Sequence, residues 1–126
     1  MPLLQFDTTL TLDDAERGSF AAFVRETYAE RMHTGTDHVA VVVREHDQSA
    51  LSIGRGVDGD LLFLDAEVRR GRADGTKRAF ALAVMERVRE EFGVPTPNLK
   101  VVFTEHDGPS MMGYDRVGGE WTREEG

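Results

Sequence analysis

The chain contains no cysteine, has only two lysines, Lys77 and Lys100, and has no apolar run of the roughly 18 residues that crosses a membrane. The absence of cysteine excludes disulfides, thiolate nucleophiles and cysteine-based zinc sites. A formal net charge of −8 without a basic stripe argues against nucleic acid or an anionic membrane as partner. No signal-peptide pattern is visible near the start. From these features we expect a cytoplasmic protein.

Two further kinds of site are not expected from the sequence. The four histidines, His33, His38, His46 and His106, lack the spacing of metal ligands, so no metal site is predicted. The glycines within residues 54–59 are not followed by a helix with capping residues, so they do not predict a phosphate-binding loop.

A strand–helix–strand pattern occurs twice along the chain. One helix is expected to begin near Thr11, which can cap it, and to stop at Gly35, and a second is expected over residues 74–92. Apolar runs predict strands at residues 2–6, 39–43, 61–64 and 99–103. The Val-rich runs at 39–43 and 99–103 are expected to be buried on both faces of a sheet.

The predicted fold is α/β (α+β), with duplicated β-α-β units forming a four-stranded sheet that carries two helices on one face. We expect one domain over residues 1–126, with repeats at about 2–44 and 60–105. The tail over 107–126, which contains Trp121, is expected to be irregular or a short hairpin. The second face of the sheet, expected to be rich in Val and Leu, would be covered by other copies of the chain.

A β-α-β duplication that starts at Pro2 resembles the tautomerase superfamily, in which this proline becomes the first residue once Met1 is excised. The Thr-Gly-Thr-Asp-His run at residues 34–38 and the Arg-Arg-Gly-Arg turn at 69–72 are similar to motifs of the cis-3-chloroacrylic acid dehalogenase group. The resemblance implies the fold of macrophage migration inhibitory factor (MIF) and a homotrimer.

A second group of the same superfamily shares other motifs with the chain. Residues 2–7 look like the opening of malonate semialdehyde decarboxylase, and Arg70-Gly-Arg72 followed by residues 77–80 is similar to that enzyme's Arg-Pro-Arg and its helix. We favour the dehalogenase-like group over this one.

Pro2 and two arginines are the candidate catalytic residues. An amino-terminal proline carries a secondary amine, and nearby cations and burial bring the pKa of such an amine toward neutrality, where it can act as general base and acid. Arg69 and Arg72 have the guanidinium forks that bind a substrate carboxylate and withdraw electrons, so no cofactor is expected. Alternation along the strand turns Arg70 away from Arg69, which makes Arg70 a secondary candidate for substrate binding.

Three further residues are candidates for substrate contact: Asp37, Glu30 and Tyr114. Glu30 and Gly113, next to Tyr114, stand where the dehalogenase has its water-activating His and Glu, and about Val102 stands where it has a Tyr. Efficient hydrolytic dehalogenation is therefore not expected. Asp37 matches an Asp of the decarboxylase, which keeps decarboxylation or hydration open.

The sequence thus predicts a cofactor-independent isomerase, a keto–enol tautomerase acting on a small conjugated or keto carboxylic acid. A lyase activity, decarboxylation or hydration, is the alternative within the same chemistry. A non-catalytic, oligomeric protein that keeps the fold is the alternative from another class.

Overall fold

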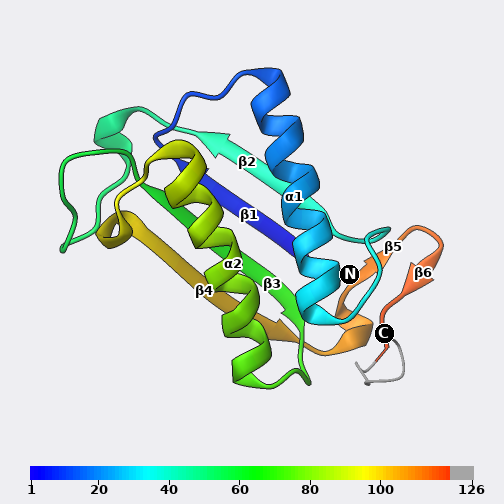
Figure 1. The fold of residues 1–126 in the computed structure, drawn as a ribbon. Coiled ribbons are helices and arrows are strands. Elements are labelled where there is room, and N and C mark those ends of the chain that lie inside the picture. The colour runs from blue at the N-terminus through cyan, green and yellow to red at the C-terminus, as the bar shows by residue number, and fades with distance from the viewer. Residues whose placement is uncertain (120–126) are drawn as a thin grey trace.

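Four strands form one mixed sheet in the order β2-β1-β3-β4 in the computed structural model, which describes residues 1–119 (Figure 1). The strands are β1 (Leu3–Thr8), β2 (Ala40–Glu45), β3 (Leu62–Arg69) and β4 (Leu99–His106). β1 runs parallel to β2 and β3 runs parallel to β4, whereas the central pair of β1 and β3 is antiparallel. Two β-α-β units therefore meet along β1 and β3, and the predicted fold class is confirmed.

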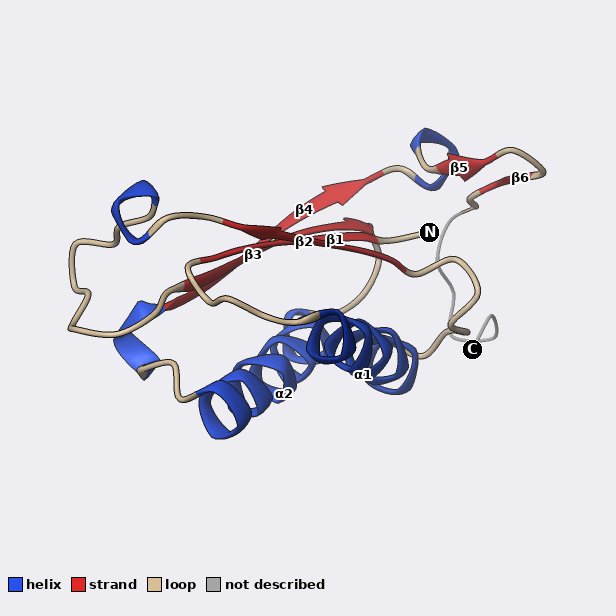
Figure 2. Cartoon of the chain, turned by 90° about the horizontal axis from the view of Figure 1, so that it is seen from above, coloured by secondary structure: helices blue, strands red, loops and turns tan. Residues whose placement is uncertain are grey.

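Both long helices cover the same face of this sheet, as Figure 2 shows. α1 (Asp14–Met32) follows β1 and α2 (Asp74–Phe92) follows β3. Alternation along β1 and β3 sends every second side chain toward the helices, where these side chains form the core with residues of both helices. Its largest fully buried members are Tyr28, Phe6, Phe20 and Phe80. The ring of Tyr28 meets Phe80 edge to face at 5.1 Å, which joins α1 to α2.

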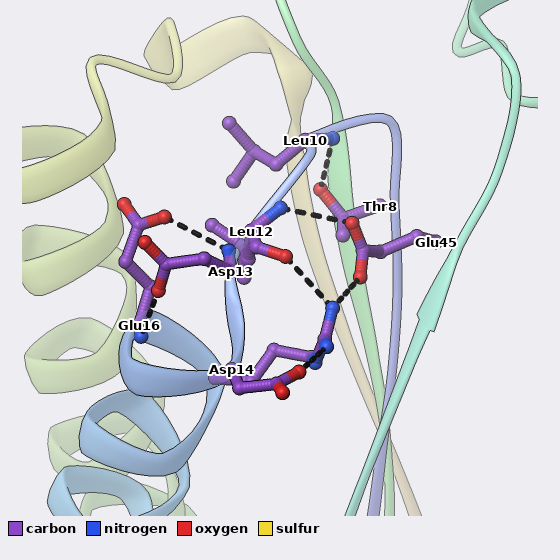
Figure 3. Close-up of polar contacts among 8 residues, drawn as sticks. Thr8, Leu10, Leu12, Asp13, Asp14, Glu16 and Glu45 are labelled. Atoms are coloured by element: carbon purple, nitrogen blue, oxygen red, sulfur yellow. Dashed lines mark hydrogen bonds and ion pairs between the residues drawn. The ribbon is translucent and has the colours of Figure 1, made fainter.

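The first helix begins later than predicted, because Asp13 rather than Thr11 caps it. The Asp13 carboxylate accepts the backbone N–H of Glu16 at 2.7 Å, and the Glu16 carboxylate accepts the N–H of Asp13 at 3.0 Å (Figure 3). This reciprocal pair satisfies two donors that a helix start otherwise leaves open. Glu45, at the end of β2, accepts the N–H of Leu12 at 2.9 Å and so ties the helix start to the sheet.

The outer strands β2 and β4 are half exposed, so the prediction that both are buried on both faces is wrong. Each pairs with only one neighbour within the sheet, and each lies at an edge. The face opposite the helices is also mixed rather than rich in Val and Leu, because alternation sends most of the apolar residues of β1 and β3 to the helix side. The strands place the following polar residues on that open face: Gln5, Asp7, Arg44, Asp65, Glu67, Lys100, Thr104 and His106.

A short hairpin follows the sheet. For this tail the sequence predicted either irregular structure or a short hairpin. Its strands are β5 (Met112–Gly113) and β6 (Arg116–Val117), and in Figure 1 it lies beside the amino terminus. Trp121 lies outside the described residues. Residues 1–119 also contain three 3-10 turns, at Gln48–Ala50, Thr96–Asn98 and Gly108–Ser110. Within residues 1–119, no helix is both long and apolar enough to cross a membrane.

Candidate active site

A cleft of about 400 Å³ opens at the end of the sheet where the chain starts. β1 is parallel to β2 and antiparallel to β3. The first residues of β1 and β2 and the last residues of β3 therefore lie at this same end of the sheet. The cleft is therefore built from four segments that are far apart in the sequence. Its walls are Met1, Pro2, the segment 34–38, Arg69, Arg116 and Gly118.

Pro2 is a buried residue that lines this cleft. Its carbonyl accepts the backbone N–H of Ala40 at 3.1 Å, which extends the β1–β2 ladder by one residue and holds the proline in place. Met1 precedes it on the wall of the cleft. While Met1 is attached, the proline nitrogen is a peptide nitrogen without basicity. Excision of Met1 converts that nitrogen into a secondary amine at the same position.

Two cationic side chains line the same cleft as Pro2. Arg69, the last residue of β3, lines the cleft, and its Nη1 donates to the carbonyl of Gly119 at 2.7 Å. Arg116 reaches the same space from β6. Asp37 supplies the carboxylate among the described lining residues, so the two guanidinium groups leave the cleft with a net positive charge. Such a site favours an anionic ligand.

Arg72 lies elsewhere, beneath the end of α1. It is 5% exposed, its Nε donates to the carbonyl of Met32 at 2.8 Å, and its guanidinium stands 5.7 Å from the ring centre of Tyr28. The turn before it depends on Gly71, whose φ of 123° is rarely adopted by other residues. Arg72 is not among the residues that line the cleft. Its direct contact with a substrate stays a prediction, and its position favours support of the segment that follows α1.

Tyr28 is a buried phenol that lies close to Arg72. Burial raises the pKa of the Tyr28 phenol, and the charges of Arg72 and Arg69 oppose that rise. The phenol is therefore neutral at physiological pH and serves as a packing residue between the two helices.

The structure does not bring the remaining candidates into the cleft. Arg70 forms an exposed ion pair with Asp107, with 3.2 Å between Nη2 and Oδ1. Glu30 lies on α1 beside a separate shallow depression near the start of α2. Tyr114 is fully exposed in the turn of the β5–β6 hairpin.

Arg116 is a lining residue that the sequence reasoning missed. The Gly- and Pro-containing tail did suggest a hairpin, but nothing in its local pattern indicated that the hairpin would lie over the chain start. Gly113 confirms the proximity, because a Cβ placed on it would lie 3.9 Å from Met1 Cε. A side chain at position 113 would therefore reach residue 1, and the glycine provides no functional group there.

No group of three or more His, Asp or Glu side chains within residues 1–119 is arranged to hold a metal ion. The polar groups that line the cleft are guanidinium, carboxylate, imidazole and hydroxyl groups of protein side chains. This set of groups can bind the carboxylate of a small molecule and transfer protons to and from that molecule.

Comparison with known proteins identifies the fold. No family model matches the sequence, and no curated protein does. The structure is similar to that of N1, a member of the cis-3-chloroacrylic acid dehalogenase family, with a TM-score of 0.84 and 19% identity over 98% of this chain and 87% of that one. It is also similar to a malonate semialdehyde decarboxylase inhibited by 3-bromopropiolate, with a TM-score of 0.76 and 19% identity over 90% and 91%.

A third similar structure is a fused 4-OT described as a symmetric trimer, with a TM-score of 0.79 and 14% identity over 92% of this chain and 97% of that one. Together these structures represent the tautomerase superfamily. The chain has the β-α-β fold of that superfamily, and the predicted resemblance is confirmed at the level of the fold.

Proposed function

We propose that the chain is a cofactor-independent tautomerase that acts on a small conjugated or keto carboxylic acid. The observation that carries this proposal is that Pro2, which precedes β1, and Arg69, which ends β3, line one cleft although they are far apart in the sequence. A base and a carboxylate-binding cation in one cleft can hold a substrate in register for proton transfer.

In the proposed reaction, Arg69 and Arg116 bind the substrate carboxylate through their guanidinium groups. The free amine of Pro2 removes a proton from the enol oxygen or from the carbon next to the carbonyl. The same guanidinium groups stabilise the negative charge that develops on the conjugated intermediate. The Pro2 ammonium then returns the proton to a different atom of the conjugated system, which completes the isomerisation.

The cleft also supports the basicity that this mechanism needs. An ordinary α-amino group has a pKa near ~8. Neighbouring guanidinium groups and burial both disfavour the protonated amine and therefore lower its pKa. Pro2 is buried, and two arginines line the same cleft. A base whose pKa lies near the working pH transfers protons in both directions.

Self-association is part of the proposal. The edge strands β2 and β4 leave Val41, Val43, Val101 and Phe103 only partly buried in the single chain. A similar fold forms a symmetric trimer in the fused 4-OT. We therefore propose a homotrimer, in which further copies cover these edges. The cytoplasmic location stays a prediction.

Decarboxylation is the second candidate, and the position of Asp37 favours it. Asp37 lines the same cleft as Pro2 and Arg69, whereas Glu30 does not. A carboxylate there accepts hydrogen bonds and can position a water molecule beside the substrate. Release of CO₂ from malonate semialdehyde, measured alongside tautomerisation, separates the two activities.

The proposal is tested with protein whose intact mass shows that Met1 has been removed. Such protein is expected to convert phenylenolpyruvate to its keto form, followed by the loss of enol absorbance. Absence of turnover of this substrate and of 2-hydroxymuconate by Met1-free protein would refute the tautomerase assignment. Quantitative retention of Met1 would exclude the amine mechanism.

Arg69→Gln is expected to raise KM and to lower kcat/KM for phenylenolpyruvate by about 10- to 100-fold, because a hydrogen-bonded charge contributes about 1.5–3 kcal/mol. Steady-state kinetics measure the effect. Arg70→Gln is the matched control. It removes the same charge from the neighbouring residue, whose guanidinium forms an exposed ion pair with Asp107. Equal kinetics for the two variants would contradict the role of Arg69.

A further inference from the structure

Arg72 is a buried charge that takes no part in the proposed reaction. It is almost fully buried, and it is not among the described residues that line the cleft. An arginine side chain stays charged in proteins, and removal of that charge from water is costly unless other polar groups replace the water. The groups that surround the guanidinium therefore show what the buried charge holds in place.

The guanidinium binds the carboxyl-terminal end of α1. Arg72 Nε donates to the carbonyl of Met32, the last residue of α1, at 2.8 Å. A helix leaves its last four carbonyls without partners inside the helix, and their dipoles give this end a partial negative charge. A cation that donates to one of these carbonyls therefore stabilises the helix end. The guanidinium also lies 5.7 Å from the ring centre of Tyr28, whose ring packs on Phe80 of α2, so the core fixes its position.

The segment that leaves α1 at this point leads directly into the cleft. Its five successive residues, 34–38, all line the cleft. They are half or fully exposed and have no regular secondary structure, whereas Met32 before them and Val39 after them are buried. The far end is held by the N–H of Ala40, which donates to the carbonyl of Pro2 at 3.1 Å. A segment with so few buried contacts keeps its shape only while both of its ends are anchored.

Arg72 ties the near end of this segment to the second β-α-β unit. The cap of α1 is itself a backbone bond, from the N–H of Thr34 to the carbonyl of Ala29 at 3.0 Å, and it lasts only while the final turn stays wound. The bond from Arg72 reaches that final turn from another part of the chain, the turn between β3 and α2. Gly71 sets the path of this turn through its φ of 123°. Arg72 therefore couples the two units at the point where the cleft segment begins.

We propose that Arg72 is a positioning residue, which holds the end of α1 so that residues 34–38 keep their place in the cleft. It acts on the reaction through this segment and does not contact the substrate carboxylate, which the proposed reaction assigns to Arg69 and Arg116. The kinetic part of this inference rests on the proposed function. The anchoring of the segment does not, because it is a property of the fold that is measured without a substrate.

Backbone hydrogen exchange tests the anchoring. Arg72→Met removes the guanidinium and keeps an unbranched apolar side chain. The amides of Thr34, Val39 and Ala40 are expected to exchange about tenfold faster relative to the amides of β1, because a bond to a charged group no longer opposes local opening. The comparison with β1, at the centre of the sheet, separates this local effect from a general loss of stability. Arg72→Lys keeps a cation without the planar guanidinium, so its exchange is expected to lie between those of the parent and Arg72→Met.

Arg70→Met is the matched control for the exchange measurement. It removes the same group from the neighbouring residue, whose exposed guanidinium pairs with Asp107. Exchange over residues 33–40 is expected to stay that of the parent protein. Parent-like exchange in Arg72→Met, or an equal increase in Arg70→Met, would overturn the anchoring. If Arg72→Met does not fold, Arg72→Lys decides by the same criteria.

Kinetics with a neutral substrate separate positioning from direct contact. The methyl ester of phenylenolpyruvate lacks the carboxylate that Arg69 is proposed to bind. Arg72→Lys is expected to lower kcat/KM for the acid and for the ester by the same factor, about tenfold, because a displaced cleft segment affects both substrates. Arg69→Gln is expected to lower kcat/KM for the acid and to leave that for the ester unchanged. A loss in Arg72→Lys that is confined to the acid would show contact with the carboxylate and overturn the positioning role.

The two proposals fail in different ways. Absence of turnover in the Met1-free parent protein would refute the proposed function, and the exchange measurement would still decide whether Arg72 anchors the segment. Turnover in the parent protein together with parent-like exchange in the Arg72 variants would remove the positioning role and leave the tautomerase assignment intact. Faster exchange over residues 33–40 with equal kinetic losses on the acid and the ester supports both.

Discussion

Pro2→Ala is expected to lower kcat/KM for phenylenolpyruvate by about 10²- to 10⁴-fold, the usual contribution of a positioned general base. Alanine at position two still permits removal of Met1, so the variant keeps a free amine. That amine is primary and is not part of a rigid ring. In the parent protein the ring of Pro2 lines the cleft, and the hydrogen bond from the Ala40 N–H to the Pro2 carbonyl fixes the residue in place. Steady-state kinetics on protein of verified mass measure the change.

A protein that keeps Pro2 but carries an uncleaved amino-terminal extension is the control. Its fold and cleft arginines are unchanged, but its proline nitrogen is a peptide nitrogen. Its turnover is expected to fall as far as that of Pro2→Ala or further. Removal of the extension by a protease that leaves Pro2 first should restore activity. Turnover that is the same in all these forms would show that the amine takes no part in the reaction.

Phe20→Ala is expected to lower the free energy of unfolding by about 3–5 kcal/mol, because it leaves a cavity in the centre of the core. Phe20 is 1% exposed, and its ring meets Phe6 edge to face at 5.0 Å and Phe92 at 6.0 Å. These contacts join α1 to β1 and to the end of α2. A domain of this size has a total stability of about 5–15 kcal/mol, so a large fraction is lost.

Denaturant unfolding measured at one fixed protein concentration tests this prediction, since self-association would make stability concentration-dependent. Leu82→Ala is the matched control, because Leu82 is an apolar residue of α2 that is 45% exposed. Its effect is expected to stay within about 1 kcal/mol. Comparable losses in the two variants would contradict the assignment of Phe20 to the centre of the core.

Helix and strand positions could be predicted because their signals are local. Alternation along residues 62–68 separates the side chains that face the helices from those on the open face. The helical spacing of the apolar residues within 74–92 predicts α2. This helix ends where Gly93 adopts a φ of 69°. The cap of α1 was misplaced by two residues, because Thr11 and Asp13 have similar capping chemistry. Only the reciprocal bonds with Glu16 distinguish them.

The Arg-Arg-Gly-Arg turn shows where local patterns stop being sufficient. Alternation predicts that Arg69 and Arg70 face different surroundings, and in the structure Arg69 lines the cleft while Arg70 pairs with Asp107. The position of Arg72 depends on Gly71, whose positive φ turns the chain so that the guanidinium reaches Met32 under α1. That contact joins residues forty positions apart, and no periodicity within the turn indicates it.

The sequence by itself determined the duplicated β-α-β plan and the one-sided placement of the helices, since both follow from periodicity and crossover handedness. Its resemblance to the tautomerase superfamily made Pro2 and Arg69 candidate site residues. The tertiary structure alone decided which groups share a cleft. The antiparallel pairing of β1 with β3 brings the chain start to the end of β3. The hairpin then places Arg116 in the cleft that Met1 and Pro2 line. Such neighbours are set by long-range pairing and packing, whose partners no local pattern specifies.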